Sequence, residues 1–378
     1  MKPGSRFTRI SIPCRAGPSD LDEEAPLQYV SDVYSGKSTP AIPGSGSEKH
    51  NPVDGAGSGS GRLVPNFLST LPIKRSLYST DSYFLDSIED LAAVAGDSFR
   101  RFCRDHTLLL LKPDAIVSRR APAVLRWVTD HGFSIVGAVP VMFTRHTVRA
   151  LWQYGLNAAS RDRRDTADLY MTAGECVLLL LAQAGQAESA TAILSRAKGP
   201  AEPENCRPHH LRYAVGSFNY QLNLVHGADE PADLLRELGI LCDHDQRLRL
   251  FSAAVADVDG TAAAYALVDR VQNTAPEVDL DLGRTLDEIA VAANHVEPTR
   301  VPDPAPELAR VITRIRAGES RDWRQLFELA EKYQVKITMW QRIVIATYLL
   351  DPHIPGAVSM LPDASTGVIP HATEIHHR

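Results

Sequence analysis

The sequence predicts an α+β fold, and three observations carry that prediction. Short apolar runs rich in Leu, Val and Ile recur between residues 106 and 241. The segments between these runs repeat their apolar residues at the spacing of an amphipathic helix. Beyond residue 241 the pattern is mostly helical. The alternation of strand and helix suits a four-stranded antiparallel sheet with helices on one face, the ferredoxin-like plan, followed by a C-terminal α-helical region.

Each element of the sheet region has its own signal in the sequence. The expected strands are residues 107–111, 133–143, 175–181 and 222–225. The expected helices are residues 122–131, 147–154, 187–196 and 230–238. Gly132 directly follows the first of these helices, where a glycine commonly forms the left-handed C-terminal cap. The order of elements therefore defines a domain with four strands and four helices.

The flanking regions differ from this domain in composition. Residues 35–62 are rich in Gly, Ser and Pro and cannot bury enough apolar surface to offset their ordering entropy. Prolines between residues 298 and 306 indicate a linker between C-terminal helices. The expected parts are a disordered tail (1–75), a helical lead-in (76–105), the α+β domain (106–241), a helical region (242–360) and a flexible tail (361–378).

Composition excludes several classes of protein. A formal net charge of -6 argues against a general or sequence-specific nucleic-acid binder, which needs a basic face. The five cysteines are scattered without CxxC spacing, which is typical of a reducing compartment. The longest apolar run is far too short for a membrane span, and no apolar signal segment follows the N-terminus. We therefore expect a cytoplasmic protein without a membrane partner.

Two short motifs carry the candidate chemistry. Lys112-Pro113-Asp114 ends the first strand, and Asn223-Leu224-Val225-His226-Gly227 surrounds the last one. A lysine can neutralise phosphate as a point charge, and neutral imidazole is a competent nucleophile near pH 7. Together they suit phosphoryl transfer, which needs mainly positioning and charge neutralisation. The alternatives are an ordinary lysine at a strand end and an ordinary loop histidine.

Four blocks in the same order resemble the nucleoside diphosphate kinase family over residues 106–241. They are Leu110-Leu111-Lys112-Pro113-Asp114-Ala115, His131-Gly132-Phe133, Tyr170-Met171-Thr172-Ala173-Gly174 and Asn223-Leu224-Val225-His226-Gly227-Ala228-Asp229. The resemblance implies transfer of the γ-phosphate of ATP to a nucleoside diphosphate through phosphorylated His226, with Mg²⁺ bridging the nucleotide phosphates. It also implies nucleoside di- and triphosphates as partners, and an assembly of several copies of the chain.

The resemblance also assigns roles to individual residues. Lys112 matches the lysine that holds the transferred phosphate, and Glu237 the glutamate that orients the histidine ring. The residues that match nucleotide-binding positions are Tyr154, Arg196, Arg212 and Asn223. No protein-held metal site is implied. Glu237 could instead be a solvent-facing helix residue, and Tyr154 a core aromatic beside Trp152.

The chain departs from the family at several binding positions. No Thr or Ser lies between Lys198 and Leu211, where the family has a threonine that contacts phosphate. The family's base-stacking aromatic falls near Arg161 to Arg164, a basic run that is either a solvated loop or a lid over an anionic nucleotide. Ala228 replaces a serine that supports the glutamate. These departures favour a rival hypothesis, a degenerate domain that binds nucleotides or proteins without turnover.

Two further alternatives follow from the residues. The domain could be a specialised phosphotransferase whose acceptor is not a nucleoside diphosphate. Cys206, His209 and His210 have a spacing that zinc could use, but a second ligand pair is lacking in the sequence nearby. A P-loop ATPase is disfavoured because nothing in the chain matches GxxxxGK[ST].

Overall fold

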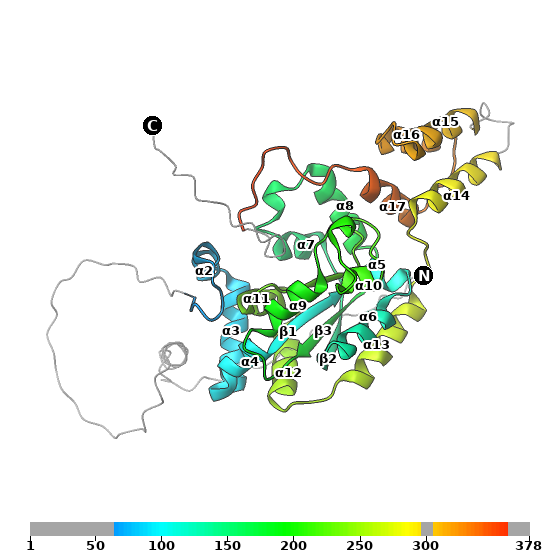
Figure 1. Cartoon of the computed structure of the whole chain (residues 1–378). Coiled ribbons are helices and arrows are strands. Elements are labelled where there is room, and N and C mark those ends of the chain that lie inside the picture. Colours follow the sequence, from blue (N-terminus) through cyan, green and yellow to red (C-terminus); the bar gives the residue numbers. More distant parts are fainter. Residues whose placement is uncertain (1–63, 296–304, 362–378) are drawn as a thin grey trace, which may run out of the picture. The chain divides into compact units, whose positions relative to one another are not determined.

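The computed structural model describes residues 64–295 and 305–361, all of which belong to the unit Lys49–Arg378. Its centre is one sheet of four antiparallel strands (Figure 1). The strands are β1 (His106–Leu111), β2 (Ser134–Val141), β3 (Cys176–Ala182) and β4 (Val225–Gly227). Their order across the sheet is β2-β3-β1-β4, which confirms the ferredoxin-like plan.

The strands form where the sequence is continuously apolar, because the inner strands are buried on both faces. Leu108 to Leu111 point alternately to opposite faces of β1, and all four are fully buried. Helices therefore cover both faces, whereas the sequence pattern predicted helices on one face. β2 lies at an edge of the sheet, which is where a strand can tolerate Pro140.

Helices of the sheet region begin and end at recognisable signals. α6 (Ala121–Asp130) ends at His131, and Gly132 follows with φ of 80°, so the predicted glycine cap is confirmed. α8 (Arg161–Met171) begins at Ser160, whose side chain caps the amide of Arg163. Arg161 to Arg164 therefore form the first turn of a helix rather than a loop. The other helices here are α5 (Pro113–Val117), α7 (Arg145–Leu151), α9 (Ala190–Lys198), α10 (Leu211–Ala214) and α11 (Pro231–Leu241).

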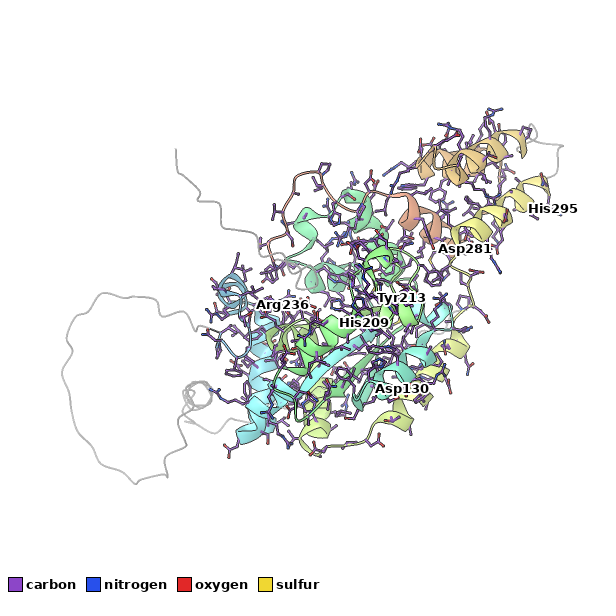
Figure 2. All side chains as sticks on the ribbon, viewed as in Figure 1. Asp130, His209, Tyr213, Arg236, Asp281 and His295 are labelled. Carbon is purple, nitrogen blue, oxygen red and sulfur yellow. The ribbon has the colours of Figure 1, made fainter. Side chains whose placement is uncertain are left out.

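The N-terminal lead-in packs directly on the domain. It consists of α2 (Pro72–Tyr78), α3 (Ser82–Ala95) and α4 (Phe99–Asp105). α2 begins within the segment that the composition assigned to the disordered tail, while residues 1–63 lie outside the described residues. Arg236 of α11, labelled in Figure 2, is 1% exposed and donates to Asp81 before α3. This buried ion pair joins the lead-in to the domain.

Two helices beyond residue 241 complete the same core. They are α12 (His244–Val255) and α13 (Thr261–Thr274). Ala264, Val268 and Val271 of α13 pack in one cluster with apolar residues of β1, β2 and β3. The sheet domain is therefore larger as a packing unit than the expected range 106–241.

The remaining helices enclose a second apolar cluster. They are α14 (Leu282–Asn294), α15 (Ala305–Arg316), α16 (Trp323–Lys332) and α17 (Met339–Leu349). Leu286, Leu308, Leu326 and Ile345 are fully buried within this cluster. Short 3₁₀ turns occupy Gly96–Ser98, Leu156–Ala158 and Pro203–Asn205. Throughout residues 64–295 and 305–361, every helix is too short or too polar to cross a bilayer.

Candidate active site

Lys112 stands at the end of β1, directly before α5, and its side chain is buried. Its ammonium group donates to Gln221 O and to Asn223 Oδ1, each at 2.6 Å. The centroid of the Tyr170 ring lies 5.1 Å from Lys112 Nζ. Burial lowers the pKa of Lys112 to about 8, although Asp114 opposes the effect. The lysine is therefore a buried cation whose charge is lost at a pH close to neutrality.

Asp114 connects the lysine motif to the histidine motif. Its Oδ2 accepts a hydrogen bond from the amide of Leu224 at 2.8 Å. Leu224 has φ of 72°, a conformation that costs energy for any residue with a side chain. The amide of Lys112 also donates to Leu224 O at 3.0 Å. These two bonds hold the bend that leads into β4, so the first motif fixes the path of the second.

His226 lies within β4 rather than after it, because the fourth strand is shifted relative to the predicted residues 222–225. The side chain of Asn219 accepts from the amides of Gln221 and Leu222, which keeps this segment in a turn. Strand pairing begins at Val225, opposite Leu111 of β1. The shift brings the end of β1, with Lys112, next to the strand that carries His226.

The imidazole of His226 is oriented by Glu237 of α11. Nε2 of His226 lies 2.9 Å from Glu237 Oε2, and both side chains are mostly buried. An ionised carboxylate only accepts hydrogen bonds, so this contact places the ring proton on Nε2. Nδ1 then keeps its lone pair, which is what a nucleophilic nitrogen requires. The edge of Trp152 packs on the imidazole with ring centroids 5.6 Å apart, so Trp152 contacts the site and is more than a core aromatic.

These groups line one cavity of about 350 Å³. Among its lining residues are Lys112, Tyr154, Arg212, Asn223, His226 and Glu237. Six of the seven residues predicted from the sequence therefore meet at one place. The seventh, Arg196, is exposed, pairs with Glu188 and is not among the lining residues.

The neighbours of the lining residues differ from what the resemblance implies. Asn223 directs its oxygen to the ammonium of Lys112. Arg212 donates to Gly199 O at 2.8 Å and to Val225 O at 2.9 Å, which ties α10 to β4. The hydroxyl of Tyr154 donates to Asp81 Oδ2 at 3.1 Å. Several of these groups thus support the cavity wall as well as facing it.

Two buried lysines in the cavity wall were not predicted. Lys198, at the end of α9, donates to Gly227 O at 3.0 Å and lies 3.5 Å from Asp229 Oδ1. Lys74 of α2 lies 2.8 Å from both Glu230 and Asp233, which raise its pKa although burial opposes them. Lys198 directly precedes the segment that lacks the threonine expected from the family resemblance. Lys74 belongs to the segment that composition assigned to the tail.

The acidic side chains of the cavity are each engaged by a cation or a histidine. Burial opposes the ionisation of Asp229, but Lys198 and Ser195 together hold its pKa below the ordinary value. Asp233 bonds to Lys74 and Tyr78, and Glu237 to His226. Within the described residues, no three His, Cys, Asp or Glu side chains are grouped as a metal ion requires, including those near Cys206.

Known proteins of one family are similar in sequence to the sheet region of this chain. The model of the nucleoside diphosphate kinase family matches residues 105–246. A nucleoside diphosphate kinase of Salinibacter ruber is 27% identical over 137 residues, which cover 36% of this chain and 89% of that protein. Thioredoxin domain-containing protein 6 of Homo sapiens is also 27% identical over 141 residues, 36% of this chain but only 42% of that protein.

A solved structure of the Aquifex aeolicus nucleoside diphosphate kinase covers 38% of this chain and 97% of its own, with 19% identity and a TM-score of 0.32. The match to the family model spans the sheet, the lysine motif, the histidine and its glutamate partner. Residues 105–246 of this chain therefore form a divergent domain that is similar to nucleoside diphosphate kinases.

Proposed function

We propose that this domain is a phosphotransferase that moves the γ-phosphate of ATP to a nucleoside diphosphate through His226. The observation that supports it most strongly is the joint placement of Lys112 and His226 in one cavity, with Nε2 of the histidine bonded to Glu237. A buried cation and an oriented nucleophile are the minimum that phosphoryl transfer requires.

In the first half-reaction Nδ1 of His226 attacks the γ-phosphorus. An N–P bond forms while the bond from phosphorus to the β,γ-bridging oxygen breaks, and ADP departs with that electron pair. The carboxylate of Glu237 stabilises the positive charge that develops on the imidazole. In the second half-reaction a terminal oxygen of the acceptor diphosphate attacks phosphorus and the N–P bond breaks, which restores neutral His226.

Lys112 supplies the charge that holds the transferred phosphate, and Arg212 and Lys198 lie in the same cavity. Mg²⁺, if bound with the nucleotide, would neutralise part of the phosphate charge. Asp229, Asp233 and Glu237 are each engaged by other side chains, so the nucleotide's own phosphates would be the main ligands of the ion. Tyr154 and Asn223 complete the proposed nucleotide site. Arg196 is left out of the proposal because it lies outside the cavity wall.

The test is incubation of the full chain with γ-labelled ATP and Mg²⁺, followed by addition of unlabelled GDP. The wild-type protein is expected to acquire an acid-labile label and to release it as labelled GTP. His226→Gln should acquire none, whereas the exposed control Glu188→Gln should behave as the wild type. A wild-type protein without acid-labile label would refute the proposed enzyme.

A second candidate is a degenerate domain that binds nucleotides without turnover. This candidate is favoured because Lys112 and Arg212 already donate hydrogen bonds to protein oxygens. These oxygens would compete with phosphate for the two cations. Nucleotide would then raise the melting temperature without labelling His226, since a ligand that binds the folded state stabilises it. Label that is not released to any nucleoside diphosphate would instead indicate a different acceptor.

A further inference from the structure

The segment that follows α17 lies along the loop between α7 and α8. We call residues 351–361 the strap. The amide of Ser160 donates to Pro352 O at 3.1 Å, and the Ser160 hydroxyl donates to Asp351 O at 2.6 Å. The amide of Ile354 donates to Ala158 O at 3.0 Å. The first part of the strap is therefore held by main-chain contacts, although it lies more than a hundred residues beyond the match at 105–246.

The second part of the strap is held by one side chain and one carbonyl. Asn157 Nδ2 donates to Val358 O at 2.9 Å, while its Oδ1 accepts from the amide of Met360 at 3.1 Å. Tyr154 O accepts from the amide of Leu361 and from the hydroxyl of Ser359, each at 3.3 Å. The strap is thus fixed to residues 154–160 at several points along its length.

The docked strap forms part of the wall of the catalytic cavity. His353, Ser359 and Leu361 line the same cavity as His226. The ring of His353 meets the ring of Tyr220 at an angle of 72°, with centroids 5.4 Å apart. The strap therefore adds side chains to the candidate active site that the matched domain does not itself contain.

Arg163 and Tyr220 both contact His353, and they also stack on each other. The guanidinium carbon of Arg163 lies 4.7 Å from the centroid of the Tyr220 ring, and Arg163 also approaches His353 Nδ1 at 3.4 Å. A base inserted between two planar groups needs about 3.5 Å on each side, or about 7 Å in total. Arg163 and Tyr220 therefore lie too close together for a base to enter between them, and His353 of the strap contacts both.

The phosphate-handling end of the cavity is built by other elements. Lys112 is positioned by Gln221 and Asn223, and His226 is positioned by Glu237. All of these residues belong to the matched domain. The cavity volume of about 350 Å³ is near the lower end of the range for small-molecule sites. Removal of the strap would therefore enlarge the end with Tyr154 and Tyr220 and leave the end with Lys112 unchanged.

We propose that the strap is a specificity gate that closes the nucleoside end of the cavity and leaves the phosphate end open. The proposal rests on the function proposed above, because it takes the ligand to be a nucleotide. While the strap is docked, His353, Ser359 and Leu361 occupy the end of the cavity next to Tyr220. A nucleotide binds only the fraction of molecules in which the strap has left, so its apparent affinity falls by that fraction.

The test compares Mg²⁺-ADP with Mg²⁺-pyrophosphate by isothermal titration calorimetry. The two ligands share a diphosphate and differ by the nucleoside. The variant chain ends at Leu350 and lacks the strap, and the matched control ends at Leu361 and keeps it. Removal of the strap is expected to tighten ADP binding at least tenfold relative to the control. The affinity for pyrophosphate should stay within about twofold.

A point variant tests the gate without truncation. Asn157→Ala removes two hydrogen bonds to the strap and should tighten ADP binding by about threefold to tenfold. Asn273→Ala, at an exposed position of α13, is its control. Unchanged or weaker ADP binding in both strap variants would overturn the gate, as would equal tightening for ADP and pyrophosphate. Tighter ADP binding in the strap variants, together with no label on His226 after incubation with ATP, would support the gate. The same result would refute the proposed phosphotransferase.

Discussion

At the scale of single residues, the reactivity proposed for His226 depends on the carboxylate of Glu237. The contact of 2.9 Å between His226 Nε2 and Glu237 Oε2 fixes both the ring orientation and the tautomer. Glu237→Gln keeps the shape of the side chain but removes its charge. A hydrogen bond to a charged group contributes about 1.5–3 kcal/mol, so labelling of His226 by ATP should slow by about tenfold to a hundredfold.

Rapid-quench measurement of the labelled fraction gives this rate. Glu188→Gln is the matched control, because Glu188 is exposed and pairs with Arg196 outside the cavity wall. Wild-type labelling kinetics in Glu237→Gln would mean that the ring needs no orienting partner. Far-UV circular dichroism of both variants shows whether the fold is retained.

Lys112 predicts a distinct pH dependence. Burial lowers its pKa to about 8, so the ammonium charge in the free protein is present below that pH and is lost above it. Affinity for Mg²⁺-pyrophosphate should therefore fall as pH rises from about 7 to about 9.5. In Lys112→Met the binding should be weaker at pH 7 and nearly independent of pH over this window.

The lowered pKa of Lys112 affects stability in the opposite direction from ligand affinity. Between pH 8 and the ordinary lysine pKa of 10.5, the unfolded chain binds the proton that the folded chain lacks. This group therefore makes the free energy of unfolding increase with pH in that window. Pyrophosphate affinity that stays constant through pH 8 in the wild type would contradict the role of Lys112 as the phosphate-binding cation.

The sequence predicted the residues whose chemistry is local and missed those that depend on the fold. Lys112 and His226 stand in short motifs, and Glu237 was assigned by the family resemblance. Lys74 and Lys198 carry no motif, and burial alone distinguishes them from ordinary surface lysines. Arg196 was assigned by its position in the chain, but helix α9 directs it toward Glu188 and away from the cavity.

At the scale of elements, Arg236 holds the lead-in against the domain. Its guanidinium donates to Asp81 Oδ2 at 2.7 Å and to the carbonyl of Ala150 at 2.8 Å. Replacement by Met leaves Asp81 buried without its cation, which typically costs about 3–5 kcal/mol. Arg236→Met should therefore lower the free energy of unfolding by that amount in urea denaturation.

The control for this variant is an ion pair of the same chemistry on the surface. Arg101 lies 3.7 Å from Asp257, and both side chains are largely exposed. Arg101→Met should change the free energy of unfolding by at most about 1 kcal/mol. Equal effects of the two substitutions would show that the lead-in does not depend on Arg236.

Elements with strong periodicity were predicted well, and the exceptions have physical causes. Strands β1 and β3 follow from runs of leucine. β4 was predicted three residues early because Leu222 and Leu224 are apolar, yet Asn219 and Asp114 bind their amides in a turn. α8 was not predicted because its first turn is charged, and its helical start depends on the cap by Ser160.

At the scale of the whole chain, two of the apolar clusters in the described residues have different partners. One joins the sheet to α6, α9 and α13, and the other joins α14 to α17. Leu326→Ala opens a cavity in the second cluster and should destabilise it by about 2–5 kcal/mol. Amide hydrogen exchange should accelerate in α14 to α17 and remain slow in β1 and β3.

Leu179→Ala is the matched substitution in the sheet cluster and should accelerate exchange in β1 and β3. Equal acceleration in both clusters for Leu326→Ala would mean that the two unfold as one cooperative unit. Sequence periodicity predicted the helices of the second cluster but not the docking of the strap on residues 154–160. That docking rests on single contacts such as those of Asn157, for which no pattern exists.

The central claim is that Nδ1 of His226 carries the phosphoryl group. The most direct measurement is ³¹P–¹⁵N correlation NMR of the full chain, labelled with ¹⁵N-histidine and incubated with Mg²⁺-ATP, with His226→Gln as the reference. The account predicts one phosphorus resonance, coupled to Nδ1 of His226 and absent from the variant. Phosphorus on Nε2, on another residue or on none would contradict it.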